Sequence, residues 1–324
     1  MRKIWMIGLL FTTAVLSGCD EKEFLQEEPL DFFSIENSYR TENDFERALT
    51  DLYARVRDIN FGSSENINYF AHFQATDIAK HARGDADRFG DYNVWLVPTN
   101  SMVKFHWERW YKVIANANTI ISRIEHTDLS EARKSSIRAE AKFFRGLSYR
   151  YLVYIYGAVP LILEEVTSPR TDLVRASKQE VLAQIIADME EAAANLPAIN
   201  QVVDGKVSNL VASHLLAETL IAAGRLDDAI TASSKVINDP NVGLMTTRFG
   251  NKANEQDKDV YWDLFQRGNQ KRSGGNRESL WIARMEPDVP GGSILSAGGT
   301  QNCLERFAVP AGWTLTDPEG KTGM

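Results

Sequence analysis

The sequence predicts a mainly α-helical protein, in which TPR-like helix pairs stack into an α-solenoid core with long irregular loops and a few short strands. Apolar residues recur at helical spacing over long segments, and glycines or prolines stand where those segments end. Residues 208–240 have the small residues, the central glycine and the terminal proline of a tetratricopeptide repeat. One such repeat cannot bury its own apolar face, so we expect the helices of residues 103–238 to form the stack.

The N-terminus has the features of a bacterial lipoprotein signal peptide. Two basic residues precede an apolar run, residues 4–16, which is shorter than the roughly 20 residues that cross a bilayer. Small residues then precede Cys19, as in a lipobox. We therefore predict a signal peptide over residues 1–18 and acylation of Cys19, which would anchor the protein to the membrane. The alternative is an ordinary secreted protein.

The remaining chain is predicted to be an acidic tether, residues 19–40, followed by one helical domain, residues 41–324. Removing the signal peptide deletes two basic residues and no acidic one, which leaves 34 basic against 44 acidic residues, a charge of −10. Such a chain, without a basic cluster, is a poor candidate for binding nucleic acid. With Cys19 lipidated, Cys303 has no partner for an intramolecular disulfide and is interpreted as an inert, partly buried residue.

Apolar stripes predict the first two helices. Thr41 and Asp44 form a predicted capping box at the start of the first. Its stripe consists of Phe45, Leu49, Leu52, Val56 and Ile59. The stripe of the second consists of Val103, Trp107, Trp110, Ile114, Ala117, Ile121 and Ile124. Because such regular spacing favours packing, we expect Trp107 and Trp110 in the core and not in a binding site.

The central helix is expected to pack on more than one side. From residue 143 to residue 156, apolar side chains cover every face, and only Arg145 and Arg150 are charged. Gly157 stands where a left-handed C-cap belongs, and Pro160 prevents the helix from continuing.

This helix and the chain after it resemble the central motif of the SusD/RagB family. These are outer-membrane lipoproteins of Bacteroidetes that bind nutrients, chiefly glycans, beside a TonB-dependent transporter. The matching residues are Ala139, Glu140, Ala141, Phe143, Arg145, Tyr149, Tyr156, Gly157, Val159, Pro160 and Leu161. The preceding helix adds Trp107, Tyr111, Ile114, Ala117 and Asn118, and residues 263–270 and 276–282 also resemble the family.

The resemblance implies the same TPR-like architecture. It extends to the end of the chain, where SusD-like proteins usually continue, so we expect a C-terminally incomplete domain, either a truncated product or a short variant. A second capping box at Ser177 and Glu180 begins a helix that ends before Pro197, and Gly224 separates two further helices. Residues 239–324 are rich in loops, with one predicted strand over residues 278–285.

Motifs of catalysis are absent from the sequence. The five histidines lack metalloprotease spacing, and there is no C-x-x-C pair, nucleophile elbow or nucleotide-binding loop. His72 and His81 lie in one polar loop region with Asp77 and Asp85, which we interpret as loop residues and not as a metal site. We therefore expect no enzymatic activity, no cofactor and no bound metal.

The predicted glycan contacts lie in the polar stretch of residues 62–98. Aromatic rings stack on the C–H face of a pyranose, and carboxylates, amides and guanidinium groups bond its hydroxyls. The candidates are Trp95, Tyr92, Asn93, Arg83 and Asp77, with Trp313 in the last loop as a weaker one. In SusD-like glycan binders an aromatic-bearing loop at this place contributes to the site. The alternative is that Trp95 holds the loop on the core.

The expected function is that of a surface-exposed lipoprotein of the outer membrane. It would bind a polysaccharide or oligosaccharide and hand it to a SusC-like, TonB-dependent transporter, as the resemblance implies. One alternative is a TPR-like protein-interaction scaffold without a glycan site, and another is a periplasmic or surface hydrolase.

Overall fold

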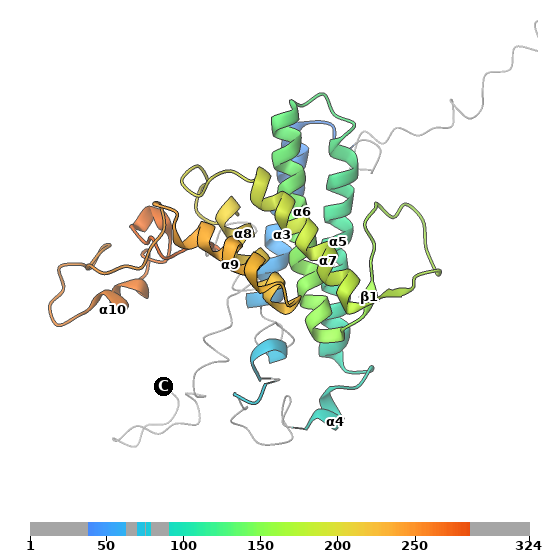
Figure 1. The fold of residues 1–324 in the computed structure, drawn as a ribbon, viewed down its shortest axis with the longest axis horizontal. Helices are drawn as coiled ribbons and strands as arrows, with labels where there is room; N and C mark the ends of the chain where they lie inside the picture. The colour runs from blue at the N-terminus through green and yellow to red at the C-terminus, as the bar shows by residue number, and fades with distance from the viewer. Residues whose placement is uncertain (1–37, 63–69, 75, 79–90, 286–324) are drawn as a thin grey trace, which may run out of the picture. The chain divides into compact units, whose positions relative to one another are not determined.

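The computed structural model describes residues 38–62, 70–74, 76–78 and 91–285 (Figure 1). The chain divides into two compact units, residues 1–44 and residues 45–324. Several residues with a predicted role lie outside the described ranges, namely Cys19, Arg83, Cys303 and Trp313.

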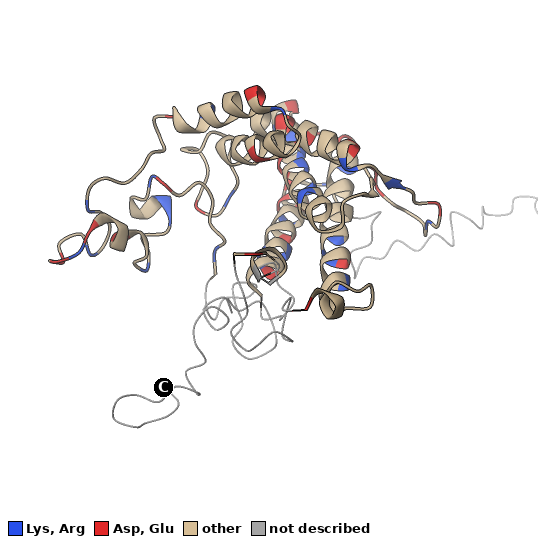
Figure 2. Ribbon diagram, turned by 60° about the horizontal axis from the view of Figure 1, so that its bottom comes forward, with Lys and Arg blue, Asp and Glu red and all other residues tan. Residues whose placement is uncertain are grey.

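Long helices make up about half of the described chain. They are α3 (Glu42–Phe61), α5 (Ser101–Ile124), α6 (Glu131–Tyr156), α7 (Lys178–Asn195), α8 (Asn209–Ala222) and α9 (Leu226–Ile237). From α6 onward, each of these helices packs against the one before it in the chain. This arrangement confirms the predicted TPR-like helical fold. Figure 2 shows acidic and basic residues interspersed along the helices.

The predicted stripe of α3 is confirmed, because all five of its residues are buried. At the start of the helix, the backbone N–H and the hydroxyl of Thr41 both donate to the carboxylate of Asp44, at 2.8 Å each. Farther along α3, the ring of Tyr53 lies edge-on to that of Phe144 in α6, with centroids 4.6 Å apart.

The buried face of α5 begins one residue earlier than predicted. Met102 and His106 are buried, whereas Val103 and Trp107 are only half-buried. His106 is covered by His72 of the short π-helical turn η1 (Phe70–Gln74), and their ring centroids lie 6.3 Å apart. This contact joins segments distant in sequence, so the spacing within α5 did not indicate it. The remainder of the stripe agrees better, since the buried residues include Trp110, Ile114, Ala117 and Ile124.

The central helix α6 packs against α5 on one side and α7 on the other, as predicted. At Gly146 the approach to α7 is close, because an added Cβ would lie 2.9 Å from Cε of Met189. The cap residue Gly157 has φ 71° and ψ −114°, a backbone conformation that glycine adopts readily. The chain then enters β1 (Val159–Pro160), which pairs antiparallel with β2 (Arg175–Ala176).

The capping box that begins α7 is confirmed by reciprocal bonds. The backbone N–H of Ser177 donates to Oε2 of Glu180 at 2.7 Å, and that of Glu180 donates to Oγ of Ser177 at 3.3 Å. Gly224, with φ 76°, ends α8 as predicted. The last long helix, α9, buries two alanines but leaves one apolar stripe exposed, formed by Leu226, Ile230 and Ile237.

The described residues after α9, up to residue 285, lie mostly in loops, with the short helices α10 (Val260–Leu264) and η2 (Arg272–Gly274). The predicted strand over residues 278–285 is wrong, because this segment joins no β ladder. It is held by side chains instead. The indole N–H of Trp281 donates to the carbonyl of Gly205 at 2.9 Å, and Nη1 of Arg57 donates to the carbonyl of Arg284 at 2.9 Å.

Candidate functional site

A single helical turn, α4 (Tyr92–Trp95), precedes the first long helix pair. The carboxylate of Asp91 caps this turn by accepting from the backbone N–H of Asn93 at 2.9 Å and from its side-chain amide at 3.2 Å. The side chain of Asn100 then caps α5 by accepting from the N–H of Met102 at 2.8 Å. The turn is therefore held directly ahead of a 24-residue helix.

Three of the predicted glycan contacts share this turn. Tyr92 is 49% exposed, Asn93 is exposed, and Trp95 is half-buried. Two aromatic side chains thus stand at the surface beside an amide, which is the combination that sugar binding requires. Asp77 lies in a different segment, exposed in the turn after η1. Arg83 lies outside the described residues, so its predicted role stays a prediction.

The turn η1 is held against the helix pair by His72. The imidazole ring lies 5.0 Å from the ring of Tyr151 in α6, and Nε2 is buried without a hydrogen-bond partner in the described part of the chain. Burial, followed by the charge of Arg150, lowers the pKa of His72 to about 4, so this ring is neutral at pH 7. Both η1 and α4 therefore lie at the end of the pair where α5 begins and α6 ends (Figure 1).

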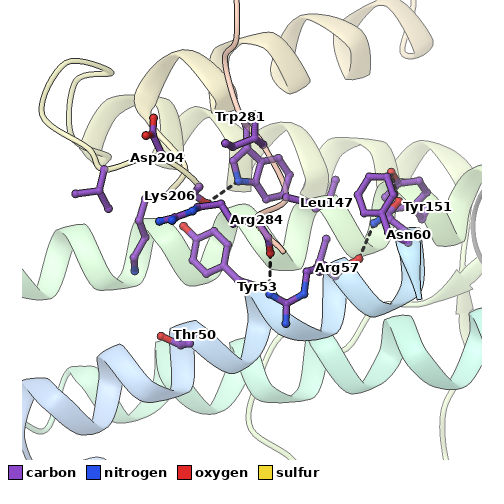
Figure 3. Close-up of a pocket in the computed structure, with 16 residues that line it drawn as sticks. Thr50, Tyr53, Arg57, Asn60, Leu147, Tyr151, Asp204, Lys206, Trp281 and Arg284 are labelled. Carbon is purple, nitrogen blue, oxygen red and sulfur yellow. Dashed lines mark hydrogen bonds between the residues drawn. The ribbon is translucent and has the colours of Figure 1, made fainter. Parts of the chain in front are cut away.

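The structure contains a cavity of about 440 Å³ that the sequence did not indicate (Figure 3). It lies between α3, α6, residues 203–206 and residues 281–284. The rings of Tyr53 and Trp281 line it, with centroids 6.3 Å apart and planes at 69°. Its walls come from four separated segments, and no local sequence pattern brings such segments together.

The main polar groups of this cavity are already engaged. The hydroxyl of Tyr53 donates to Oε1 of Glu140 at 2.7 Å and accepts from the N–H of Val207 at 2.9 Å. Nζ of Lys206 bonds Glu140 at 2.9 Å and Glu46 at 3.1 Å. Burial, reinforced by the Glu140 carboxylate, raises the pKa of Tyr53 well above its usual range. The cavity therefore suits an apolar side chain better than a hydroxylated sugar.

A second hollow, of about 310 Å³, separates α5 from the loop between β1 and β2. Trp107 and Tyr111 form its wall on α5, with ring centroids 4.9 Å apart. The Tyr111 hydroxyl donates to the carbonyl of Pro160 at 2.8 Å, which leaves its ring as the available surface. The expectation that Trp107 belongs to the core is therefore wrong in part, because this half-buried side chain packs on Tyr156 of α6 and also lines an open hollow.

The polar residues of the central motif hold the chain that leaves α6. The hydroxyl of Tyr149 donates to the carbonyl of Ile162 at 2.9 Å and accepts from the N–H of the same residue at 2.6 Å. Asn118 donates to that carbonyl at 2.8 Å, and Arg145 donates to the carbonyl of Leu163 at 3.1 Å. These side chains position a loop, and their donors and acceptors are engaged within the protein.

Two kinds of feature are absent from the described residues. Within these ranges, no group of three or more His, Cys, Asp or Glu side chains is placed to hold a metal ion. None of the helices that the structure describes is both long enough and apolar enough to cross a membrane.

Together, the stacked helices and the exposed aromatic turn define the class of protein, a helical-repeat architecture that presents aromatic side chains at its surface. The chain belongs to the SusD-like family, since residues 23–217, more than half of its length, match the family described as starch-binding and associating with the outer membrane. This match confirms the resemblance found in the central helix. The family is carbohydrate-binding and non-catalytic.

Relatives from two bacteria align with most of this chain. SusD-like protein P25 of Formosa agariphila is 24% identical over 272 residues, which cover 79% of this chain and 51% of that protein. SusD-like protein P2 of the same organism is 28% identical over 241 residues, 73% of this chain and 46% of the relative. A SusD-like protein of Bacteroides ovatus is 26% identical over 297 residues, which cover 86% of this chain and 49% of that protein. The chain thus spans about half the length of these relatives.

Solved structures share the fold. A SusD-like carbohydrate-binding protein from Bacteroides fragilis superposes with a TM-score of 0.62 at 22% identity, over 75% of this chain and 46% of that one. A laminarin-binding SusD-like protein gives a TM-score of 0.53 at 22% identity, over 65% of this chain and 48% of its own. At such identities the similarity establishes the fold alone.

Proposed function

We propose that this chain is the glycan-binding part of a lipoprotein on the outer face of the outer membrane, anchored through Cys19, that passes oligosaccharides to a TonB-dependent transporter. The observation that carries the proposal is the α4 turn, with Tyr92 exposed and Trp95 half-buried, at the start of the helix stack of a SusD-like fold. The laminarin-binding neighbour supports a glycan as the ligand class.

The geometry favours α4 over both hollows as the place of sugar contact. A pyranose needs an accessible aromatic face together with hydrogen-bonding groups that are not already used. Tyr92 is accessible, and Asp77 and Arg83 precede it within the same polar stretch of the sequence, residues 62–98. The cavity beside Tyr53 and the hollow beside Trp107 offer mainly apolar walls.

A second candidate function is the protein-interaction scaffold. It is favoured by the stripe on α9, where Leu226, Ile230 and Ile237 are 59%, 63% and 73% exposed. Exposed apolar residues aligned on one helix face are typical of surfaces that bind other helices. The glycan-binding function requires the aromatic side chains of α4, whereas the scaffold function does not.

Affinity electrophoresis separates these functions. Unlipidated protein carrying Cys19→Ser would be run through gels that contain single polysaccharides, starting with starch and laminarin. The proposal expects retardation by at least one glycan, and a loss of about tenfold in affinity for Tyr92→Ala or Trp95→Ala, as expected when a stacking ring and its hydrogen bonds are removed. Ile230→Ala on α9 is the matched control, which should leave retardation unchanged.

The opposite pattern supports the scaffold. A protein that melts cooperatively, is retarded by none of the glycans and behaves the same with and without Trp95 has no glycan site at α4. Turnover of any glycan in the same panel would instead revive the hydrolase alternative.

A further inference from the structure

The short helix α10 and its C-cap residue present two aromatic rings to solvent. Tyr261 and Phe265 are 66% and 64% exposed, and they stand one helical turn apart, so that they share a face. Their ring centroids lie 5.0 Å apart, with planes at 65°. Large exposed aromatic patches on a soluble surface are typical of binding sites, because leaving such rings in water is unfavourable.

An ion pair with a buried carboxylate holds α10 in place. The carboxylate of Asp263 is fully buried and accepts from Nε of Arg248 at 2.6 Å, from Nη2 of Arg248 at 3.0 Å and from the N–H of Phe249 at 3.0 Å. The remaining donors of Arg248 bond backbone carbonyls of the surrounding loop, those of Lys252, Glu255 and Lys258, at 2.8 Å each. One guanidinium group therefore organises the whole loop around the helix.

Asn269 completes this support from the other side. Its amide donates to the carbonyl of Asp263 at 2.9 Å. Asn269 lies so close to Gly250 that an added Cβ would meet its side-chain amide at 2.1–2.3 Å. These bonds hold a five-residue helix in place, and a surface held in place suits stacking, because little ordering entropy is then lost on binding.

This part of the chain also differs in charge from the rest. Residues 248–277 contain seven Lys and Arg against four Asp and Glu, a net charge of +3 in a chain of −8. Nζ of Lys252 and of Lys258 lies 5.4 Å and 5.5 Å from the ring centroid of Trp262, the neighbour of Tyr261. Lys258 and Arg267 are exposed, and neither forms an ion pair with another described residue.

We propose that Tyr261, Phe265 and the exposed cations that flank them in the sequence, Lys258 and Arg267, form a second carbohydrate-binding surface, selective for sugar units that carry a carboxylate or a sulfate ester. The aromatic rings would stack on the C–H face of a pyranose, while Lys258 and Arg267 pair with its anionic group. A neutral sugar would leave these cations without a counter-charge. The surface deepens the proposed function, on which it rests, by naming a substrate class.

Dextran, carboxymethyl dextran and dextran sulfate are suitable probes. They share one glucan backbone and differ only in the anionic group, so carboxylate and sulfate are tested separately. Polyacrylate serves as a polyanion without a sugar ring. In affinity gels the full unlipidated chain should be retarded more strongly by the acidic dextrans than by dextran, and the difference should shrink as salt is raised from 50 mM to 500 mM, on the order of the concentrations at which exposed charges become screened.

Paired variants separate stacking from charge. Tyr261→Ala with Phe265→Ala should weaken binding of the acidic dextrans by about fivefold or more, and leave polyacrylate unchanged, because stacking requires a ring-shaped ligand. Lys258→Gln with Arg267→Gln should weaken both. The matched control is Lys235→Gln on α9, which removes one cation from another part of the surface. Circular dichroism and thermal melts check that each variant folds.

The outcomes distinguish this inference from the proposed function. If Trp95→Ala abolishes glycan binding while folded α10 variants bind the acidic dextrans like the parent protein, the inference is overturned and the proposed function stands. If the α10 variants lose acidic dextrans while Trp95→Ala has no effect, the inference stands and the α4 site fails. Equal retardation by neutral and acidic dextrans, loss of polyacrylate binding alone in the charge variant, or no binding of any glycan overturns the inference as well.

Discussion

Arg145 and Asp188 form a bidentate ion pair between α6 and α7, with Nη2–Oδ1 at 2.7 Å and Nε–Oδ2 at 2.8 Å. Their side chains are 5% and 1% exposed. The same guanidinium donates to Oδ1 of Asn118 and to the carbonyl of Leu163, and Gln184 donates to Asp188 at 3.0 Å. The helices α5, α6 and α7 and the loop after α6 are therefore all bonded to the guanidinium group of Arg145.

Removing one partner of this pair should be strongly destabilising. Arg145→Met leaves the carboxylate of Asp188 buried without its counter-charge, which typically costs about 3–5 kcal/mol in the free energy of unfolding. The double variant Arg145→Met with Asp188→Leu should recover most of this loss, since it leaves no unpaired charge. Urea denaturation measures both.

The exposed pair Arg170–Asp172, at 2.9 Å, provides the control. Arg170→Ala should not change the unfolding midpoint measurably, because surface ion pairs contribute little. A single Arg145 variant as stable as this control would show that the buried pair does not hold the helices together.

The stability of the protein should fall as the pH decreases from about 6.5 to about 4 because of His72. Its pKa is lowered to about 4, first by burial and then by Arg150, so the unfolded chain binds the proton more readily than the folded one. The stabilisation from the neutral ring is therefore complete above the unfolded pKa and is lost on acidification, by at most about 3 kcal/mol. Two rings face His72, namely that of His106 from α5 and that of Tyr151 from α6.

His72→Phe should flatten this part of the pH profile. Thermal melts at intervals between pH 4 and pH 7, roughly the window set by the two pKa values, compare the variant with the parent. His214→Gln is the control, because the pKa of His214 is raised by Glu218 and its contribution changes with pH in the opposite direction. If His72→Phe keeps the full slope, another group causes the acid sensitivity.

Tyr92 and Trp95 should respond differently to truncation. Tyr92→Ala removes an exposed ring, so the free energy of unfolding should change by less than about 0.5 kcal/mol. Trp95→Ala removes a half-buried ring and should cost about 1–2 kcal/mol. Both should weaken retention on a polysaccharide gel if α4 is the sugar-binding turn. A destabilised Trp95→Ala that still binds glycan fully would identify Trp95 as a packing residue.

The exposed stripe of α9 should limit solubility. Ile230 is 63% exposed and stands between Leu226 and Ile237 on one face, so Ile230→Lys interrupts the apolar patch without touching the buried side of the helix. Static light scattering at rising concentration should show less association, with an unchanged melting temperature. The control Ala229→Lys changes the buried face and should lower the melting temperature. An unchanged tendency to associate in Ile230→Lys would exclude this stripe as the cause.

Local patterns predicted much of the fold. The stripe of α3, the capping box at Ser177 and the stops at Gly157 and Gly224 were predictable because helix periodicity and caps depend on residues close together in sequence. The strand predicted over residues 278–285 failed for the complementary reason. An alternating pattern forms a strand only where a partner strand is available. This segment is bonded instead to the side chain of Arg57 in α3 and to the carbonyl of Gly205.

The sequence by itself determined the class of the protein, since its helical stripes, caps and central motif led to a SusD-like helical stack that the family match confirms. Only the tertiary structure decided how single side chains are used. Trp107 and Trp110 follow the same stripe, yet one lines a hollow and the other is fully buried. Phe265 belongs to a segment that resembles the family and Tyr261 stands just before that segment, but the exposure of the two rings could not be predicted. The physical reason is that burial depends on which distant segments pack nearby, whereas spacing reports only the local helix.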